Sequence, residues 1–165
     1  MRTRRKSKPT STRAGVSDLL ATLGGLALSA FLAATFLPGT TEVVLAGLVL
    51  AADIEPWLLI TVASVFNVLG SAVNFVIGHY LARLQGSRFM PVGPDQLARA
   101  RRWFQRYGVW ALLMSWLPFI GDALPVVAGY MRANPWVAFP LIAIGKTARF
   151  VAVVWAAEAG SAVIS

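Results

Sequence analysis

Long apolar segments separated by short polar breaks dominate the chain. Leu19–Phe36 is almost entirely apolar, and segments 57–81 and 136–158 contain only a few polar residues each. A helix needs about 20 apolar residues to cross a bilayer, so we predict three membrane-spanning helices here. Segment 41–52 would form a helix only about 18 Å long. That is too short to cross a hydrocarbon core about 30 Å thick.

Proline and glycine interrupt the apolar pattern at two places. One lies between the first spanning segment and 41–52, and the other follows a short apolar arm at 109–117. These residues break or redirect helices, so we predict two hairpin turns, at Pro38, Gly39, Pro118, Gly121 and Pro125. Thr40 and Asp122 are the expected N-caps of the returning arms.

The two halves of the chain match each other in order. Pro38 with Glu42 parallels Pro118 with Asp122 at the same spacing. Further along, 43–47 parallels 126–129, Pro56-Trp57 parallels Pro135-Trp136, and 70–75 parallels 145–150. We therefore predict an all-α integral membrane protein built from two repeats, 19–82 and 109–158. Each is a broken re-entrant helical hairpin followed by a transmembrane helix, and units with one net crossing each are inverted.

The connector 83–108 carries one strongly amphipathic segment, Pro94–Tyr107. At 100° per residue, the apolar residues share one face, and they are Leu97, Ala100, Trp103, Phe104 and Tyr107. Three arginines share the other face, and they are Arg99, Arg102 and Arg106. This pattern predicts an interfacial helix that joins the repeats and contacts anionic lipid headgroups.

Composition and charge place this pattern in a membrane. Of 165 residues, 57% are hydrophobic and 13% are charged, whereas soluble domains carry about 25% charged residues. The net charge of +8 concentrates in a tail at 1–16, predicted to be disordered, and in 83–106. Such clusters set topology or contact anionic lipid. A secretory signal and nucleic-acid binding are the weaker interpretations, and with no cysteine there is no disulfide.

The two basic segments pose a topological conflict. Positive-inside logic places both in the cytoplasm, which needs an even number of crossings between them. Strictly inverted units give an odd number. Because the first arm is long enough to cross fully, we favour both segments inside, with residues 17–160 forming one multi-pass membrane domain.

Six polar residues interrupt the membrane segments: Glu42, Asn67, Asn74, Asp122, Lys146 and Arg149. A charge at mid-helix costs about 2.5–3.5 kcal/mol. Lys146 and Arg149 share a helix face, and an arginine can hold a phosphate through two hydrogen bonds. Two interpretations stay open: ion pairs that only close the core, or a water-accessible cavity that binds protons or a headgroup. No nucleophile–base set, metal spacing or phosphate loop occurs, so we predict no enzyme, metal or cofactor.

Ordered motifs in both halves resemble one known family. In the second half they are 104–108 (FQRYG), Ser115-Trp116-Leu117-Pro118, Gly121-Asp122 and Ala128-Gly129. In the first half they are 36–39 (FLPG) with Glu42, 70–74 (GSAVN) and Gly78-His79-Tyr80. Together they resemble the DedA or SNARE-associated (VTT-domain) membrane proteins, in particular the YqaA-type branch. The resemblance covers about 19–158.

This resemblance implies paired re-entrant hairpins, a bacterial inner-membrane location and a role in moving lipids. Some members are linked to flipping of undecaprenyl phosphate or phospholipids with proton or sodium coupling. Typical members carry arginines at the second hairpin turn, where this chain reads WLPFIGD at 116–122. Phosphate recognition has therefore moved to Lys146 and Arg149, or the substrate differs.

Three functions remain as hypotheses. The leading one is a lipid flippase or scramblase that supports membrane homeostasis, with Glu42 and Asp122 as its acidic pair. The second is a proton- or cation-coupled transporter of a small solute, and the third is a membrane structural or assembly factor. The chain is small for enclosing a pathway alone, so a homodimer is the expected assembly.

Overall fold

A computed structural model describes residues 15–35, 39–52, 54–81, 94–117 and 120–164. In these ranges all regular structure is helical, as the sequence predicts, and the elements are α1 (Gly15–Thr35), α2 (Thr40–Ala51), α3 (Pro56–Leu81), α4 (Pro94–Tyr107), the 3₁₀ helix η2 (Gly108–Trp116), α5 (Ala123–Tyr130) and α6 (Pro135–Ile164). Three helical stretches are long and apolar enough to span a membrane, and they are Gly15–Ala34, Pro56–Leu81 and Pro135–Ser161.

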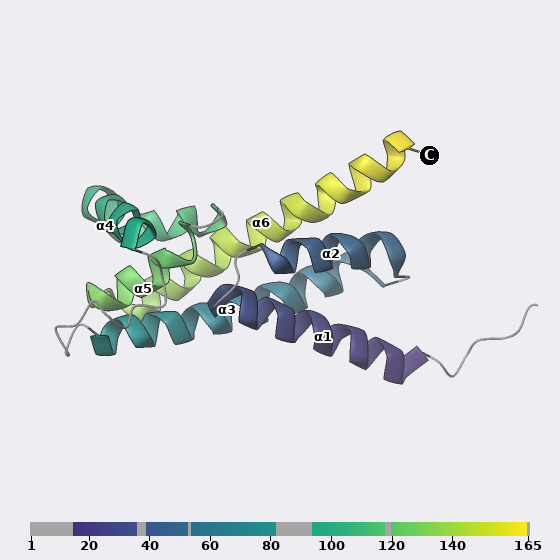
Figure 1. Ribbon diagram of the computed structural model, residues 1–165, viewed down its shortest axis with the longest axis horizontal. Helices are drawn as coiled ribbons and strands as arrows, with labels where there is room; N and C mark the ends of the chain where they lie inside the picture. The colour runs from purple at the N-terminus through teal and green to yellow at the C-terminus, as the bar shows by residue number, and fades with distance from the viewer. Residues whose placement is uncertain (1–14, 36–38, 53, 82–93, 118–119, 165) are drawn as a thin grey trace, which may run out of the picture.

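The two long helices α3 and α6 pack against each other and form the frame of the molecule (Figure 1). The first arm of each half lies on its own long helix, so α1 packs on α3 and η2 on α6. The second arm packs mainly on the long helix of the other half, so α5 contacts α3 and α2 contacts α6. Both halves of the chain therefore contribute to a shared centre.

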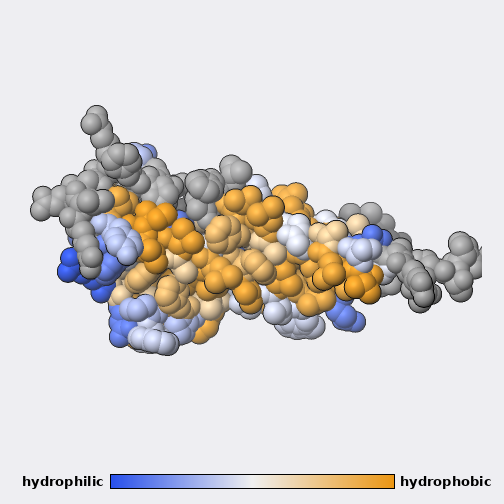
Figure 2. Space-filling view, turned by 90° about the horizontal axis from the view of Figure 1, so that it is seen from below, coloured by the Kyte–Doolittle hydropathy of each residue, from blue (hydrophilic) through white to orange (hydrophobic). Residues whose placement is uncertain are grey.

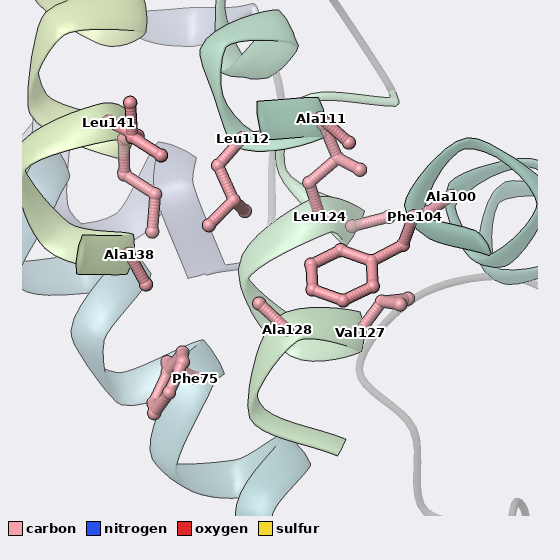
Figure 3. Close-up of a cluster of buried hydrophobic side chains, with 12 residues drawn as sticks. Phe75, Ala100, Phe104, Ala111, Leu112, Leu124, Val127, Ala128, Ala138 and Leu141 are labelled. Atoms are coloured by element: carbon pink, nitrogen blue, oxygen red, sulfur yellow. The ribbon is translucent and has the colours of Figure 1, made fainter. Parts of the chain in front are cut away.

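Two apolar clusters lie on either side of this centre. One gathers Phe75 and residues of α4, η2, α5 and the first part of α6 (Figure 3). The other gathers residues of α1, α2, the first part of α3 and the second part of α6, including Leu45 and Phe150. Along both long helices, the polar residues lie between the two clusters.

The predicted amphipathic helix α4 is present, but its apolar face is covered by protein. Ala100 and Phe104 are buried and point toward Leu124 and Val127 of α5 (Figure 3). The predicted lipid-interface residues Arg99, Arg102 and Arg106 are exposed. Helix α4 thus docks on the second hairpin and leaves its arginine face exposed, while Tyr107 at the end of the predicted apolar face is exposed as well.

Surface hydropathy follows the long axis of the molecule. Figure 2 shows apolar residues over the middle and polar residues gathered at the left end, where Figure 1 places α4. The start of α1 lies at the opposite end from α4 (Figure 1). Residues 1–14 and 82–93 lie outside the described ranges, so the placement of the tail and the 83–106 connector on one side of the membrane stays a prediction.

Several predicted helix ends differ in the structure. Residues 15 and 16, assigned to the tail, are helical, and α6 continues to Ile164. The short arm at 109–117 is a 3₁₀ helix. Pro125 does not break a helix, because it lies in the first turn of α5, where no intrahelical bond needs its missing N–H.

The predicted caps are also wrong in detail. The N-cap of α2 is Gly39, in the left-handed conformation at φ 101°, and Thr40 is already helical. A left-handed φ favours glycine, which has no Cβ to clash. Asp122 occupies the N-cap position of α5 but makes no side-chain capping bond. Pro38 and Pro118 lie outside the described residues.

Candidate functional site

The structure gathers most of the predicted polar residues at the centre of the helical frame. Lys146 and Arg149 come from α6, and Asn67 from α3. Glu42 lies in the first turn of α2, and Asp122 directly precedes α5. The helix dipole stabilises a carboxylate at each of these helix starts. Two acidic and two basic side chains therefore meet between the apolar clusters.

Lys146 forms the first group, which we call the Lys146 cluster, with Asp122 and Asn67. Its Nζ donates to Asp122 Oδ1 at 2.8 Å and to Asn67 Oδ1 at 2.5 Å. The Lys146 side chain is 0% exposed and that of Asp122 is 10% exposed. A buried charge of this kind is tolerated only when it is paired and hydrogen-bonded, and both conditions are met here.

Two asparagines of α3 connect this centre to α1. Asn67 Nδ2 donates to the carbonyl of Ala30 at 2.8 Å, and Asn74 Nδ2 donates to the carbonyl of Ala34 at 2.7 Å. Ala34 lies in the last turn of α1, where carbonyls lack an intrahelical partner. Asn74 was predicted to belong to the polar site, and the structure places it as a cap of α1.

Arg149 and Glu42 form the second charged pair, through Nη2 and Oε1. This pair is less enclosed than the Lys146 cluster, since the side chains are 8% and 22% exposed. Arg149 Nε and Nη1 have no hydrogen-bond partner. Because a guanidinium carries five N–H donors in a rigid fork, Arg149 keeps hydrogen-bonding capacity after binding Glu42.

The Glu42–Arg149 pair opens into a pocket of about 680 Å³, which we call the α2–α6 pocket. Its lining is mostly apolar and small, and consists of Gly39, Glu42, Trp116, Ala148, Arg149, Ala152, Val153 and Ala156. The three alanines repeat every fourth residue, so they form one stripe about 12 Å long on α6. A charged pair at one end of an apolar groove can bind an amphiphile.

The second hairpin turn is compact at Gly121. Its N–H donates to the carbonyl of Leu117 at 2.9 Å. A Cβ at this position would collide with the carbonyl oxygens of Ser115 and Leu117. Gly121 is thus required for close approach of the backbone rather than for a positive φ, and the turn brings Asp122 to Lys146.

Five pocket residues were not among the predicted site residues: Trp116, Val153 and the three alanines of α6. Trp116 belongs to the predicted hairpin motif, but its sequence gives no indication that it lines a cavity. Val153 is one apolar residue among many in α6, and only its place in the repeat distinguishes it. In the ranges that the structure describes, no group of three or more His, Asp or Glu side chains is arranged to hold a metal.

Comparison with known proteins agrees with the family resemblance. The VTT domain model matches residues 37–158. The chain is 37% identical over 138 residues to the inner membrane protein YqaA of Escherichia coli, a match that covers 84% of this chain and 92% of that protein. The Shigella flexneri YqaA matches equally. An uncharacterized protein of Haemophilus influenzae is 33% identical over 135 residues, which is 78% of this chain and 82% of that protein.

No solved structure gives a significant match. The family match covers well over half of the chain, and the two YqaA proteins carry their membrane location in their names. Together with three apolar helices long enough to span a bilayer, these matches fix location and family. The chain is an integral protein of the bacterial inner membrane and belongs to the VTT-domain (DedA) family, in its YqaA-type branch.

Proposed function

We propose that this protein moves an anionic lipid across the bilayer through the α2–α6 pocket. The observation that carries the proposal is Arg149, whose Nε and Nη1 are buried without partners beside an apolar pocket. Arginine binds phosphate oxygens through two parallel hydrogen bonds. A lipid phosphate at Arg149, with its acyl chain along the alanine stripe of α6, would satisfy both features.

The proposed architecture is a pair of inverted repeats with re-entrant hairpins. The pairwise packing supports it, because α1 and η2, α2 and α5, and α3 and α6 occupy equivalent places in the contact pattern. The polar centre then lies near mid-membrane, where broken backbone is tolerated only next to protein or a water-filled cavity. The Asp122–Lys146 and Glu42–Arg149 pairs would likewise lie next to protein or to a water-filled cavity.

The two acids have different proposed roles. Glu42 shares Arg149 with the incoming phosphate and is the group that we expect to exchange a coupling proton. Asp122 neutralises Lys146 and orients the second hairpin. A polar site with balanced charge can admit one anion only if a carboxylate is released or protonated, because two negative charges near one guanidinium repel each other.

Lipid movement can be measured with the full chain in vesicles of phosphatidylethanolamine and phosphatidylglycerol. A fluorescent phosphatidylglycerol in the inner leaflet becomes accessible to a membrane-impermeant quencher only when it is moved. We expect the parent to accelerate this exposure and Arg149→Ala to abolish the acceleration. Arg132→Lys, an exposed arginine between α5 and α6, is the matched control and should behave as the parent.

The same vesicles separate the three hypotheses. A small-solute transporter would move no lipid but would respond to an imposed pH or sodium gradient. A structural or assembly factor would do neither, and Arg149→Ala would change only its abundance or its partners. Lipid movement that is equal in parent and Arg149→Ala vesicles would contradict the assignment of Arg149.

A further inference from the structure

The charges around the α2–α6 pocket are unevenly available to a ligand. Among the described residues that line the pocket, Arg149 is the only cation and Glu42 the only anion. Lys146 precedes Arg149 by three residues on α6 but does not line the pocket. Its side chain is 0% exposed, and its Nζ is bonded to Asp122 and Asn67. Because Asp122 cancels the charge of Lys146, a ligand in the pocket meets Arg149 as its cation.

The Glu42 carboxylate decides when this cation is available. Its Oε1 contacts Arg149 Nη2, and its Oε2 has no hydrogen-bond partner. An anion that binds Arg149 beside an ionised Glu42 would place two negative charges together. Protonated at Oε2, Glu42 is neutral, and its O–H can donate to a phosphate oxygen. The binding-competent site then carries a single positive charge.

Phosphate lipids fall into two charge classes. A phosphodiester headgroup has one ionised oxygen, whereas a phosphate monoester approaches two negative charges, because its second proton dissociates at about pH 6. The Born cost of taking an ion out of water grows with the square of its charge, but its attraction to one cation grows only in proportion. Arg149 can therefore neutralise a diester, while a monoester would leave one buried charge uncompensated.

We propose that the α2–α6 pocket selects phosphodiester lipids over phosphate monoesters, and that Asp122 and Asn67 are positioning residues that withhold Lys146 from the headgroup. This inference rests on the proposed function, because it concerns the same site. The apolar stripe of α6 beside Arg149 accommodates an acyl chain, which a free phosphodiester does not have. The ligand class is thus a lipid whose headgroup carries one negative charge on phosphorus.

Two lipids with the same acyl chains test this charge selection with the full chain. Phosphatidylmethanol differs from phosphatidic acid only by a methyl group that caps the second acidic oxygen. Each carries a fluorophore on its acyl chain, and the impermeant quencher reports its movement, corrected for protein-free vesicles. Well above the second ionisation of phosphatidic acid, we expect the parent to move phosphatidylmethanol at least several-fold faster. Equal rates, or faster movement of phosphatidic acid, would overturn the proposal.

A change of pH separates recognition of charge from recognition of the methyl group. Below the second ionisation both lipids are monoanions, so the difference between their rates should disappear. Protonation of Glu42 affects both lipids alike, and the ratio of the two rates is therefore the quantity to compare. A preference that persists at low pH would mean that the methyl group is recognised, which would also overturn charge selection.

Variants of the Lys146 cluster test the positioning role. Asp122→Asn keeps the size and an oxygen that can accept from Lys146 Nζ, but it leaves the lysine charge uncompensated beside Arg149. Movement of phosphatidic acid should then rise relative to phosphatidylmethanol. The double variant Asp122→Leu with Lys146→Met removes both charges, so it should keep the parental ratio even where both rates fall. An unchanged ratio in Asp122→Asn, or a shifted ratio in the double variant, would contradict the role of the cluster.

The outcomes distinguish this inference from the proposed function. A parent that moves neither lipid would overturn lipid transport itself, whereas a parent that moves both lipids equally would overturn charge selection alone. The parental ratio decides this even if a variant fails to fold. Soluble dimethyl phosphate has the charge of a diester but no acyl chain, so it should not slow phosphatidylmethanol at equal concentration. Competition by dimethyl phosphate would overturn the lipid as the occupant.

Discussion

The two returning arms, α2 and α5, occupy equivalent places in the two halves but differ in their environment. In α5, every residue from Ala123 to Gly129 is buried, whereas in α2 only Thr41 and Leu45 are. Asp122 before α5 makes an ion pair in the buried Lys146 cluster, whereas Glu42 in α2 makes one at the wall of a pocket. Equivalent elements are therefore buried in one half and form the wall of a pocket in the other.

Side-chain size explains this difference. Glycine at both contact positions lets α5 reach the backbone of α3, which leaves no space between them. Between α2 and α6, Leu45 and Phe150 are instead buried in one apolar cluster, so side chains fill this contact. Substitutions at the two arms can test this contrast between a buried α5 and a partly exposed α2.

Of the two ion pairs, the buried Asp122–Lys146 pair should contribute more to the free energy of unfolding. Lys146→Met leaves the buried Asp122 carboxylate without a cation, and breaking a buried pair in this way costs about 3–5 kcal/mol. Thermal unfolding in detergent should shift strongly downward. The double variant Asp122→Leu with Lys146→Met removes both charges and should recover much of the loss. An unchanged unfolding temperature for Lys146→Met alone would contradict the anchoring role.

Alanine substitutions at Gly129 in α5 and at Gly47 in α2 should have different effects on stability. Gly129→Ala forces a methyl group against the α3 backbone, and overpacking of this kind costs about 1–3 kcal/mol. Gly47→Ala meets no atom and gains helix propensity, so it should be neutral or stabilise by up to about 1 kcal/mol. Equal effects on the unfolding temperature would show that the two arms are docked alike.

The Glu42–Arg149 pair at the pocket wall should affect transport more than stability. Arg149→Lys keeps the positive charge, and the lysine can still contact Glu42. It loses the planar fork that binds phosphate through two hydrogen bonds. We expect lipid movement to fall about tenfold, which corresponds to roughly 1.4 kcal/mol, with little change in unfolding temperature. A parallel fall in both measurements would instead assign Arg149 to the structural core.

The smallest effect concerns the cap of α1. Asn74→Ala removes one hydrogen bond to the carbonyl of Ala34, and a typical bond of this kind contributes about 1 kcal/mol. Ser71→Ala removes the local bond from Ser71 to the Asn67 carbonyl and is the control on the same helix. A loss of lipid movement in Asn74→Ala without a change in stability would contradict this capping role and assign Asn74 to the transport site.

The sequence alone determined the class of this protein, the positions of its helices and the set of residues that carries its polar centre. Hydropathy, length and amphipathic period are local properties, so the spanning helices and α4 could be located from them. The energetic cost of charge in hydrocarbon singled out Glu42, Asp122, Lys146 and Arg149 without any knowledge of their neighbours.

Only the tertiary structure decided how these residues are used. It paired Asp122 with Lys146 instead of using it as a side-chain cap at the start of α5, bonded Asn74 of α3 to the last turn of α1, and packed apolar residues of α4 against protein. It also left Gly47 open while its counterpart Gly129 is closed. These outcomes depend on which surfaces meet and at what distance, and neither is a property of any local segment.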